Sequence, residues 1–268
     1  MSAVTLGRVS EPAIGGMLRD WRRRRRLSQL ELALEAGVST RHLSFVETGR
    51  ARPSAEMVLH LAEQLEVPLR ERNRLLLAAG YAPRFGARSL DDPELAAVRD
   101  ALGRLLDSHE PYPAIAIDQG WNLVASNSAL GPLLEGVDEA LLAPPVNVLR
   151  LALHPRGLAP RILNLAQWRG HLLHRLERQL ALTGEPALAA LYEELAGYPG
   201  PQELPAHGAG EIMVQLRLAA GEGELAFFST LTTFGTAVDV TVSELSVEAF
   251  FPADERTARA LRRAAAAA

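Results

Sequence analysis

The side chains best suited to recognition chemistry lie close together, between Ser39 and Arg52. An arginine can donate two parallel hydrogen bonds to one guanine, hydroxyl groups can bond to several bases, and an aromatic ring can contact the methyl group of thymine. Side chains of these types occur here at Thr40, Arg41, Ser44 and Phe45. They could read bases if the chain presented them on one exposed face.

The segment that must position them reads as two short helices joined by a tight turn. Ser28 can cap the first helix, and Glu31, three residues later, completes a capping box. Gly37 suits the left-handed position that ends a helix, and Ser39 caps a second helix over Thr40–Thr48. This arrangement is typical of a helix-turn-helix, whose second helix enters the major groove of DNA. A helical hairpin used only for packing, the alternative, does not explain the polar residues on the exposed face.

Arg41 is the strongest candidate for a bidentate guanine contact, with a plain phosphate contact as its alternative. Phe45 could equally contact a thymine methyl group or belong to the core. Polar groups at helix ends and after the second helix are expected to contact phosphates. The residues predicted to bind DNA are Gln29, Ser39, Thr40, Arg41, Ser44, Phe45, Arg50 and Arg52.

This motif resembles the Xre and phage-repressor family. The matching positions are Leu27–Gln29, Leu32, Ala33, Gly37, Ser39, Phe45–Glu47, Gly49 and Pro53. The resemblance implies an ion pair between Arg22 and Glu47 that locks the first helix to the recognition helix. Further helical stretches extend the motif to a predicted α-helical domain of five helices.

Charge is divided unevenly along the chain. The net charge is −4, yet residues 1–90 hold 15 arginines against 9 acidic residues, and residues 91–268 hold 13 against 23. All 28 Lys and Arg positions are arginine. The basic part can approach phosphates while the acidic part stays away from them.

Several classes of protein are excluded or disfavoured. The chain has no cysteine, which excludes disulfides, thiolate metal sites and cysteine nucleophiles. It lacks a long apolar run and the order of a signal peptide, so we expect a cytoplasmic protein that does not contact a membrane. His171 and His174 lack a matching carboxylate cluster, and no nucleotide-binding or hydrolase motif occurs. We expect no metal, no resident cofactor and no enzymatic activity.

The polar stretch Arg84–Asp92 separates two predicted domains, residues 1–88 and 89–268. The second begins with a strand over 113–118, a Gln119–Gly120 turn, a return strand over 121–125 and Asn127 capping a short helix. A PAS-type sensor domain begins in this way, which predicts an α+β fold with an antiparallel sheet. The remaining elements are predicted as helices within 145–198, strands over 211–218, 224–232 and 238–249 with a turn at Gly221–Gly223, and a last helix from Asp254.

Large and polar residues of the helical middle section are candidates for lining a ligand pocket. They are His154, Arg161, Trp168 and His171. An acyl carboxylate would need a cation such as Arg161 or Arg169, although a surface salt bridge is the alternative for either arginine. Trp168 could instead belong to the core. The strands Leu225–Phe228 and Ala249–Phe251 could floor a lipid pocket or simply fill a core.

Over residues 14–252 the chain resembles the MmyB-like transcription regulators. The matching segments are Thr40–Arg50, Arg70–Pro83, Asn147–Pro155, Asn164–Trp168 and Glu185–Leu188. The resemblance implies a bacterial transcription regulator whose PAS-like second domain binds a fatty acid or similar lipid. We expect the protein to bind double-stranded operator DNA as a homodimer, with a second domain that dimerises, senses a small apolar ligand, or does both. The alternative left open is a dimeric DNA-binding protein whose second domain is only a platform for protein interactions.

Overall fold

The computed structural model describes residues 13–201, 213–221 and 223–267. The chain divides into two compact units. One comprises the residues up to Ala87 with Val238–Val240, and the other comprises Arg88–Ala237 with Thr241–Ala268. Each unit has a hydrophobic core of its own.

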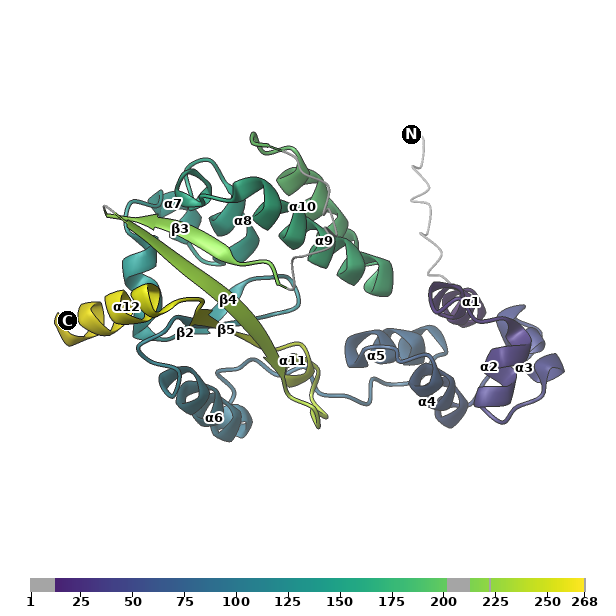
Figure 1. The fold of residues 1–268 in the computed structure, drawn as a ribbon. Coiled ribbons are helices and arrows are strands. Elements are labelled where there is room, and N and C mark those ends of the chain that lie inside the picture. The colour runs from purple at the N-terminus through teal and green to yellow at the C-terminus, as the bar shows by residue number, and fades with distance from the viewer. Residues whose placement is uncertain (1–12, 202–212, 222, 268) are drawn as a thin grey trace, which may run out of the picture. The chain divides into compact units, whose positions relative to one another are not determined.

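The described part of the first unit contains the five predicted helices (Figure 1). They are α1 (Ile14–Arg24), α2 (Gln29–Glu35), α3 (Thr40–Glu47), α4 (Ala55–Gln64) and α5 (Leu69–Ala78). The capping box of α2 is formed, because the Glu31 amide donates to the Ser28 hydroxyl (3.2 Å) and the Ser28 amide donates to the Glu31 carboxylate (2.6 Å). Gly37 has a φ of 62°, as the turn between α2 and α3 requires.

The second unit contains a five-stranded antiparallel sheet with the strand order β2-β1-β5-β4-β3. The strands are β1 (Ala114–Ile117), β2 (Leu123–Ser126), β3 (Leu216–Ala220), β4 (Gly223–Thr233) and β5 (Ser246–Pro252). This arrangement confirms the predicted α+β class with an antiparallel sheet. The position of β1 inside the sheet, between β2 and β5, and the helices on both faces explain why all four of its residues are buried.

Helices pack on both faces of this sheet (Figure 1). Side chains alternate along a strand, so Ile115 and Ile117 face one layer while Ala114 and Ala116 face the other. The isoleucine layer is packed by α8 (Val148–Leu153), α9 (Leu165–Thr183) and α10 (Pro186–Ala196), and the alanine layer by α6 (Ala96–Asp107). The remaining elements are α7 (Glu139–Leu142), α11 (Val240–Ser243), α12 (Glu255–Ala267) and the 3₁₀ helices η1 (Pro93–Leu95), η2 (Ser128–Leu134) and η3 (Ala159–Arg161).

Three expectations about this unit need correction. The strand predicted over 238–249 was too long, because Val240–Ser243 forms the short helix α11 despite its β-branched residues. Of the strand predicted over 211–218, only Leu216–Leu218 lies in β3, and residues 211 and 212 fall outside the described residues, as does Glu222 of the predicted turn. Asn127 precedes η2 without capping it. Its buried amide instead donates to the carbonyls of Leu106 and Tyr112, and its side-chain oxygen accepts from the Ala114 amide.

Candidate nucleic-acid interface and ligand cavity

Helix α3 presents one polar face because its apolar residues pack into the core on the other side. Leu43 and Val46 are buried in the core of the first unit, whereas Arg41 is exposed. The guanidinium carbon of Arg41 lies 5.3 Å from the ring centroid of the half-buried Phe45. This cation–π contact restricts the Arg41 side chain on the exposed face of α3. The Ser39 hydroxyl accepts from the His42 amide (3.1 Å), so it caps the helix.

The expected ion pair between Arg22 and Glu47 is present. Nε and Nη2 of Arg22 donate to the two carboxylate oxygens of Glu47 at 2.6 and 2.9 Å, and the Gln29 amide donates to the same carboxylate at 2.8 Å. Burial pushes the pKa of Glu47 upward, but hydrogen bonds from Arg22 and Gln29 and the charges of Arg22 and Arg19 together hold this pKa below its usual value. The pair fixes α3 to α1 at a buried point.

The residues predicted to contact phosphates have different surroundings. Arg50 is exposed, and within the described residues its side chain has no hydrogen bond or ion pair. Arg52 donates to the carbonyl of Ala79 (3.0 Å) and lies over the ring of Tyr81, so it also ties the post-α3 loop to the end of α5. The Gln29 side chain is engaged by Glu47, so its phosphate contact stays a prediction.

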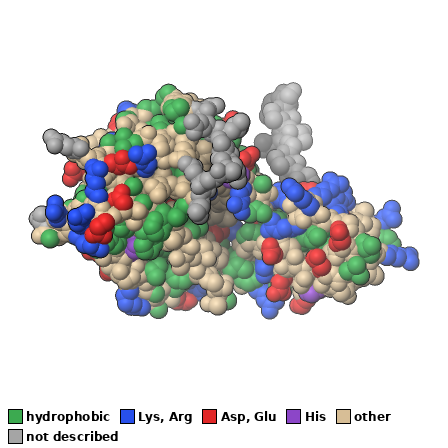
Figure 2. Space-filling model, viewed as in Figure 1, with side chains coloured by type: hydrophobic (Ala, Val, Ile, Leu, Met, Phe, Trp, Pro, Cys, Tyr) green, Lys and Arg blue, Asp and Glu red, His purple; other side chains and the backbone are tan. Residues whose placement is uncertain are grey.

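The arginine run after Trp21 has divided roles, one of which the sequence did not indicate. Arg25 donates to the carbonyls of Leu65 (2.8 Å) and Glu66 (2.9 Å), so it binds the carbonyl groups at the end of α4. Such a contact joins residues that are 40 apart in the chain. Arginines remain visible in blue on several parts of the surface of the helical unit (Figure 2).

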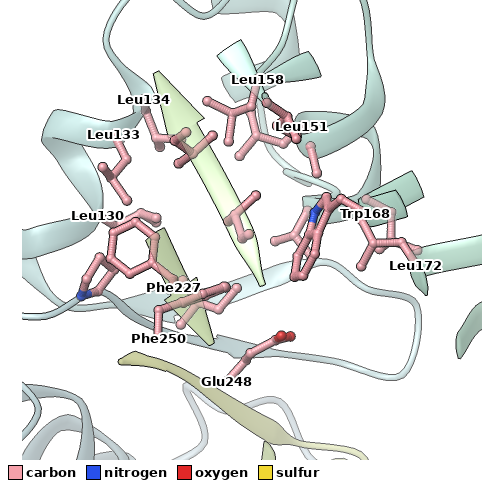
Figure 3. Close-up of a pocket in the computed structure, with 18 of the residues that line it drawn as sticks. Leu130, Leu133, Leu134, Leu151, Leu158, Trp168, Leu172, Phe227, Glu248 and Phe250 are labelled. Carbon is pink, nitrogen blue, oxygen red and sulfur yellow. The ribbon is translucent and has the colours of Figure 1, made fainter. Parts of the chain in front are cut away.

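The second unit contains a cavity of ≈ 90 Å³ beneath the layer of α8 and α9. Its wall is almost entirely leucine, isoleucine and aromatic side chains (Figure 3). The labelled residues around it are Leu130, Leu133, Leu134, Leu151, Leu158, Trp168, Leu172, Phe227, Glu248 and Phe250. A concave site with apolar walls and few polar groups is typical of small-molecule binding.

Glu248 is the exception in this wall. It is 4% exposed, and its carboxylate points toward the end of the cavity formed by Trp168 and Leu172 (Figure 3). Arg175 of α9 and the Ser229 hydroxyl donate to it at 3.1 and 2.7 Å. The guanidinium of Arg175 also lies 4.8 Å from the ring centroid of Trp121.

Of the four predicted ligand residues, the structure brings only Trp168 to the cavity wall. His171 stacks on Trp168 with ring centroids 5.4 Å apart, and burial, aided by the charge of Arg175, lowers its pKa. His154 lies away from the cavity, where its ring accepts from the Arg156 amide. Arg161 also lies outside, since it donates to the carbonyls of Leu133 and Glu135. It borders a second hollow of ≈ 450 Å³ with Arg256.

Arg169 is not a carboxylate partner in this cavity either, because it donates to the carbonyls at the end of α10. The sequence did not indicate that Glu248, Arg175 and Ser229 come together beside the cavity. One signal was available: Glu248 and Phe250 are two apart in a largely apolar strand, so they share one face of the sheet. A lone carboxylate on an apolar face needs a partner, but the sequence does not say which helix supplies it.

No group of three or more potential His, Asp or Glu metal ligands occurs in the described ranges. No helix there is both long and apolar enough to cross a membrane.

Comparison with known proteins agrees with this geometry. Residues 18–72, which span α2 to α4, match the helix-turn-helix family model. Residues 98–264 match the model of the MmyB-like transcription regulator ligand binding domain. No curated protein matches the chain. The two matches cover the helical unit that presents α3 and the sheet unit that holds the cavity, and the protein belongs to the MmyB-like transcription regulators.

Proposed function

We propose that this DNA-binding transcription regulator reads a specific operator through α3 and that an apolar ligand in the cavity of the second unit controls its binding. The observation that carries the proposal is the apolar cavity in a chain that also exposes Arg41 on a recognition helix. A ligand changes DNA binding only if it has different affinities for the DNA-competent and DNA-incompetent arrangements. A fatty acid or a related lipid has the apolar body that these walls suit.

The proposal includes an Xre-type mode of recognition by a homodimer. In this mode two copies place α3 in successive major grooves, so two half-sites lie about one helical turn apart. Arg41 reads a base, with Thr40, Ser44 and Phe45 beside it, while Arg50 and Arg52 contact phosphates. Sedimentation of the full chain with and without operator duplex tests the dimer.

Selection of binding sites from a random duplex library tests the DNA half. The wild-type protein should enrich one sequence, and Arg41→Ala should lose about 1–3 kcal/mol of discrimination at one position. Arg50→Ala is the matched control, because it should weaken specific and random duplexes alike and reduce the salt slope by about 1. Equal loss on both kinds of duplex for Arg41→Ala would remove its base-reading role.

A cavity-filling variant tests the ligand half. Dodecanoate and dodecanol are suitable probes, and at least one should bind the wild-type chain and change its operator affinity. Leu172→Trp should abolish this response, since Leu172 lines the cavity. Leu182→Trp, on an exposed part of the same helix α9, should keep it. Binding that Leu172→Trp leaves unchanged would place the ligand elsewhere.

A further inference from the structure

The chemistry of the cavity wall restricts the polar end of its ligand. Among the described residues that line the cavity, Glu248 alone is ionisable. Its carboxylate points toward the end of the cavity where Trp168 and Leu172 lie (Figure 3). A polar group of a ligand that enters this end therefore lies beside a carboxylate.

The carboxylate of Glu248 has unused hydrogen-bonding capacity. Oε1 accepts from the Ser229 hydroxyl (2.7 Å) and from Nη1 of Arg175 (3.1 Å). Within the described residues Oε2 receives only a long bond of 3.4 Å from the same Nη1. A buried acceptor with a weak partner is costly, because water no longer satisfies it. A donor group on the ligand would supply the missing bond.

The charge of this region is already balanced, because Arg175 pairs with Glu248. An ionised carboxylate on the ligand could only accept hydrogen bonds and would add a second negative charge beside Glu248. An ammonium group would leave a positive charge in excess over the pair. An uncharged hydroxyl donates one hydrogen bond and leaves the charges of Arg175 and Glu248 balanced.

We infer that the ligand of this cavity is an apolar molecule whose polar end is an uncharged hydroxyl group, which donates to Oε2 of Glu248. The inference rests on the proposed function, in which the cavity holds an apolar ligand. It narrows the expected lipid from a fatty acid to an alcohol-type molecule, since Arg161 and Arg169, the cations considered for a carboxylate, bond elsewhere.

Calorimetric titration of the full chain at neutral pH tests this inference with dodecanol, dodecanoate and dodecylamine, which share one alkyl chain. Dodecanol should bind at least about tenfold more tightly than either charged amphiphile, because only it gains a hydrogen bond without an unbalanced charge. Dodecanoate binding as tightly as dodecanol would overturn the inference while leaving the proposed function intact. Failure of all three to bind would overturn the proposed function as well.

A second measurement assigns the preference to Glu248. Glu248→Gln removes the negative charge and leaves Arg175 uncompensated, so the ratio of dodecanol to dodecanoate affinity should fall at least about tenfold. Glu194→Gln is the matched control, because Glu194 pairs with Arg150 (2.7 Å) without lining the cavity. It should keep the wild-type ratio. An unchanged ratio in a folded Glu248→Gln variant would overturn the inference, and the wild-type titration decides the case if that variant does not fold.

Discussion

Glu47 in the first unit and Glu248 in the second are both almost completely buried, at 3% and 4% exposed, yet their surroundings differ. Both oxygens of Glu47 accept short hydrogen bonds, from two nitrogens of Arg22 and from Gln29. Glu248 is bonded by one nitrogen of Arg175 and by Ser229, and it lines the cavity. A fully bonded carboxylate fixes two helices together, whereas a partly bonded one beside a cavity can still accept from a ligand.

The packing is also tighter around Glu47 than around Glu248. In the first unit α1 lies so close to α3 that a Cβ atom on Gly15 would be 2.4 Å from the carbonyl oxygen of Val46. In the second unit Ala152 and Leu172 border open volume. A presenting surface benefits from rigidity, because displaced side chains lose base contacts, while a sensing domain needs space for its ligand.

The largest effect is expected when the two carboxylates are neutralised separately. Glu47→Gln should cost about 3–5 kcal/mol of the first unit's stability, because it leaves the buried charge of Arg22 without its partner. Glu248→Gln should cost less, about 1–3 kcal/mol, since 22% of the Arg175 side chain is exposed to water. Urea titration of the full chain, followed by hydrogen exchange of peptides from each unit, measures both. Equal losses would break the distinction between a structural and a ligand-facing carboxylate.

Acidic pH should remove part of the stabilisation that the Arg22–Glu47 pair provides. The pKa of Glu47 is held below its usual value of 4.5, so its contribution is fully present above that value and is lost as pH falls through the lower pKa of the folded state. The stability difference between wild type and Glu47→Gln should therefore narrow below about pH 4. Urea titrations between neutral and acidic pH follow this difference. A constant difference over this range would contradict the role of the ionised pair.

Gly15→Ala tests the close contact between α1 and α3. The added methyl group must displace the backbone at Val46 and Glu47, so we expect a loss of about 1–3 kcal/mol and weaker operator binding. Gly16→Ala is the control, because a Cβ there has no neighbour within 4 Å. It should stabilise α1 by about 0.5–1 kcal/mol, as alanine does in a helix. Thermal unfolding compares the two, and similar effects would show that the contact can relax.

Filling the cavity should have a small effect on stability, and it should stabilise the protein where the substitutions of Glu47, Glu248 and Gly15 destabilise it. Ala152→Leu adds apolar volume on the wall of the cavity, so we expect a gain of at most about 1 kcal/mol in the second unit. The same variant should weaken dodecanol binding. Hydrogen exchange of the α8 and α9 peptides measures the gain. A loss as large as that of Gly15→Ala would mean that the second core is packed as fully as the first.

Much of the first unit was predictable because its determinants are local. The Ser28–Glu31 capping box and Gly37 are set by residues that are neighbours in the chain, and the motif with its Arg22–Glu47 pair has constant spacing. In the second unit the long helices and the β3–β4 hairpin were predicted for the same reason. The helix at Val240–Ser243 was missed, because β-branched residues favour a strand until tertiary contacts decide otherwise.

The sequence by itself determined the helix-turn-helix, the α+β class of the second domain, the uneven charge and the family resemblance. Only the tertiary structure decided which polar residues meet. Arg175 and Glu248 are 73 residues apart, and the register of β5 together with the path of α9 brings them together. The tertiary structure also places Trp168 in the wall of the cavity and His154 and Arg161 outside it. Local rules fix the period of an element, but the orientation of its faces depends on packing between distant segments.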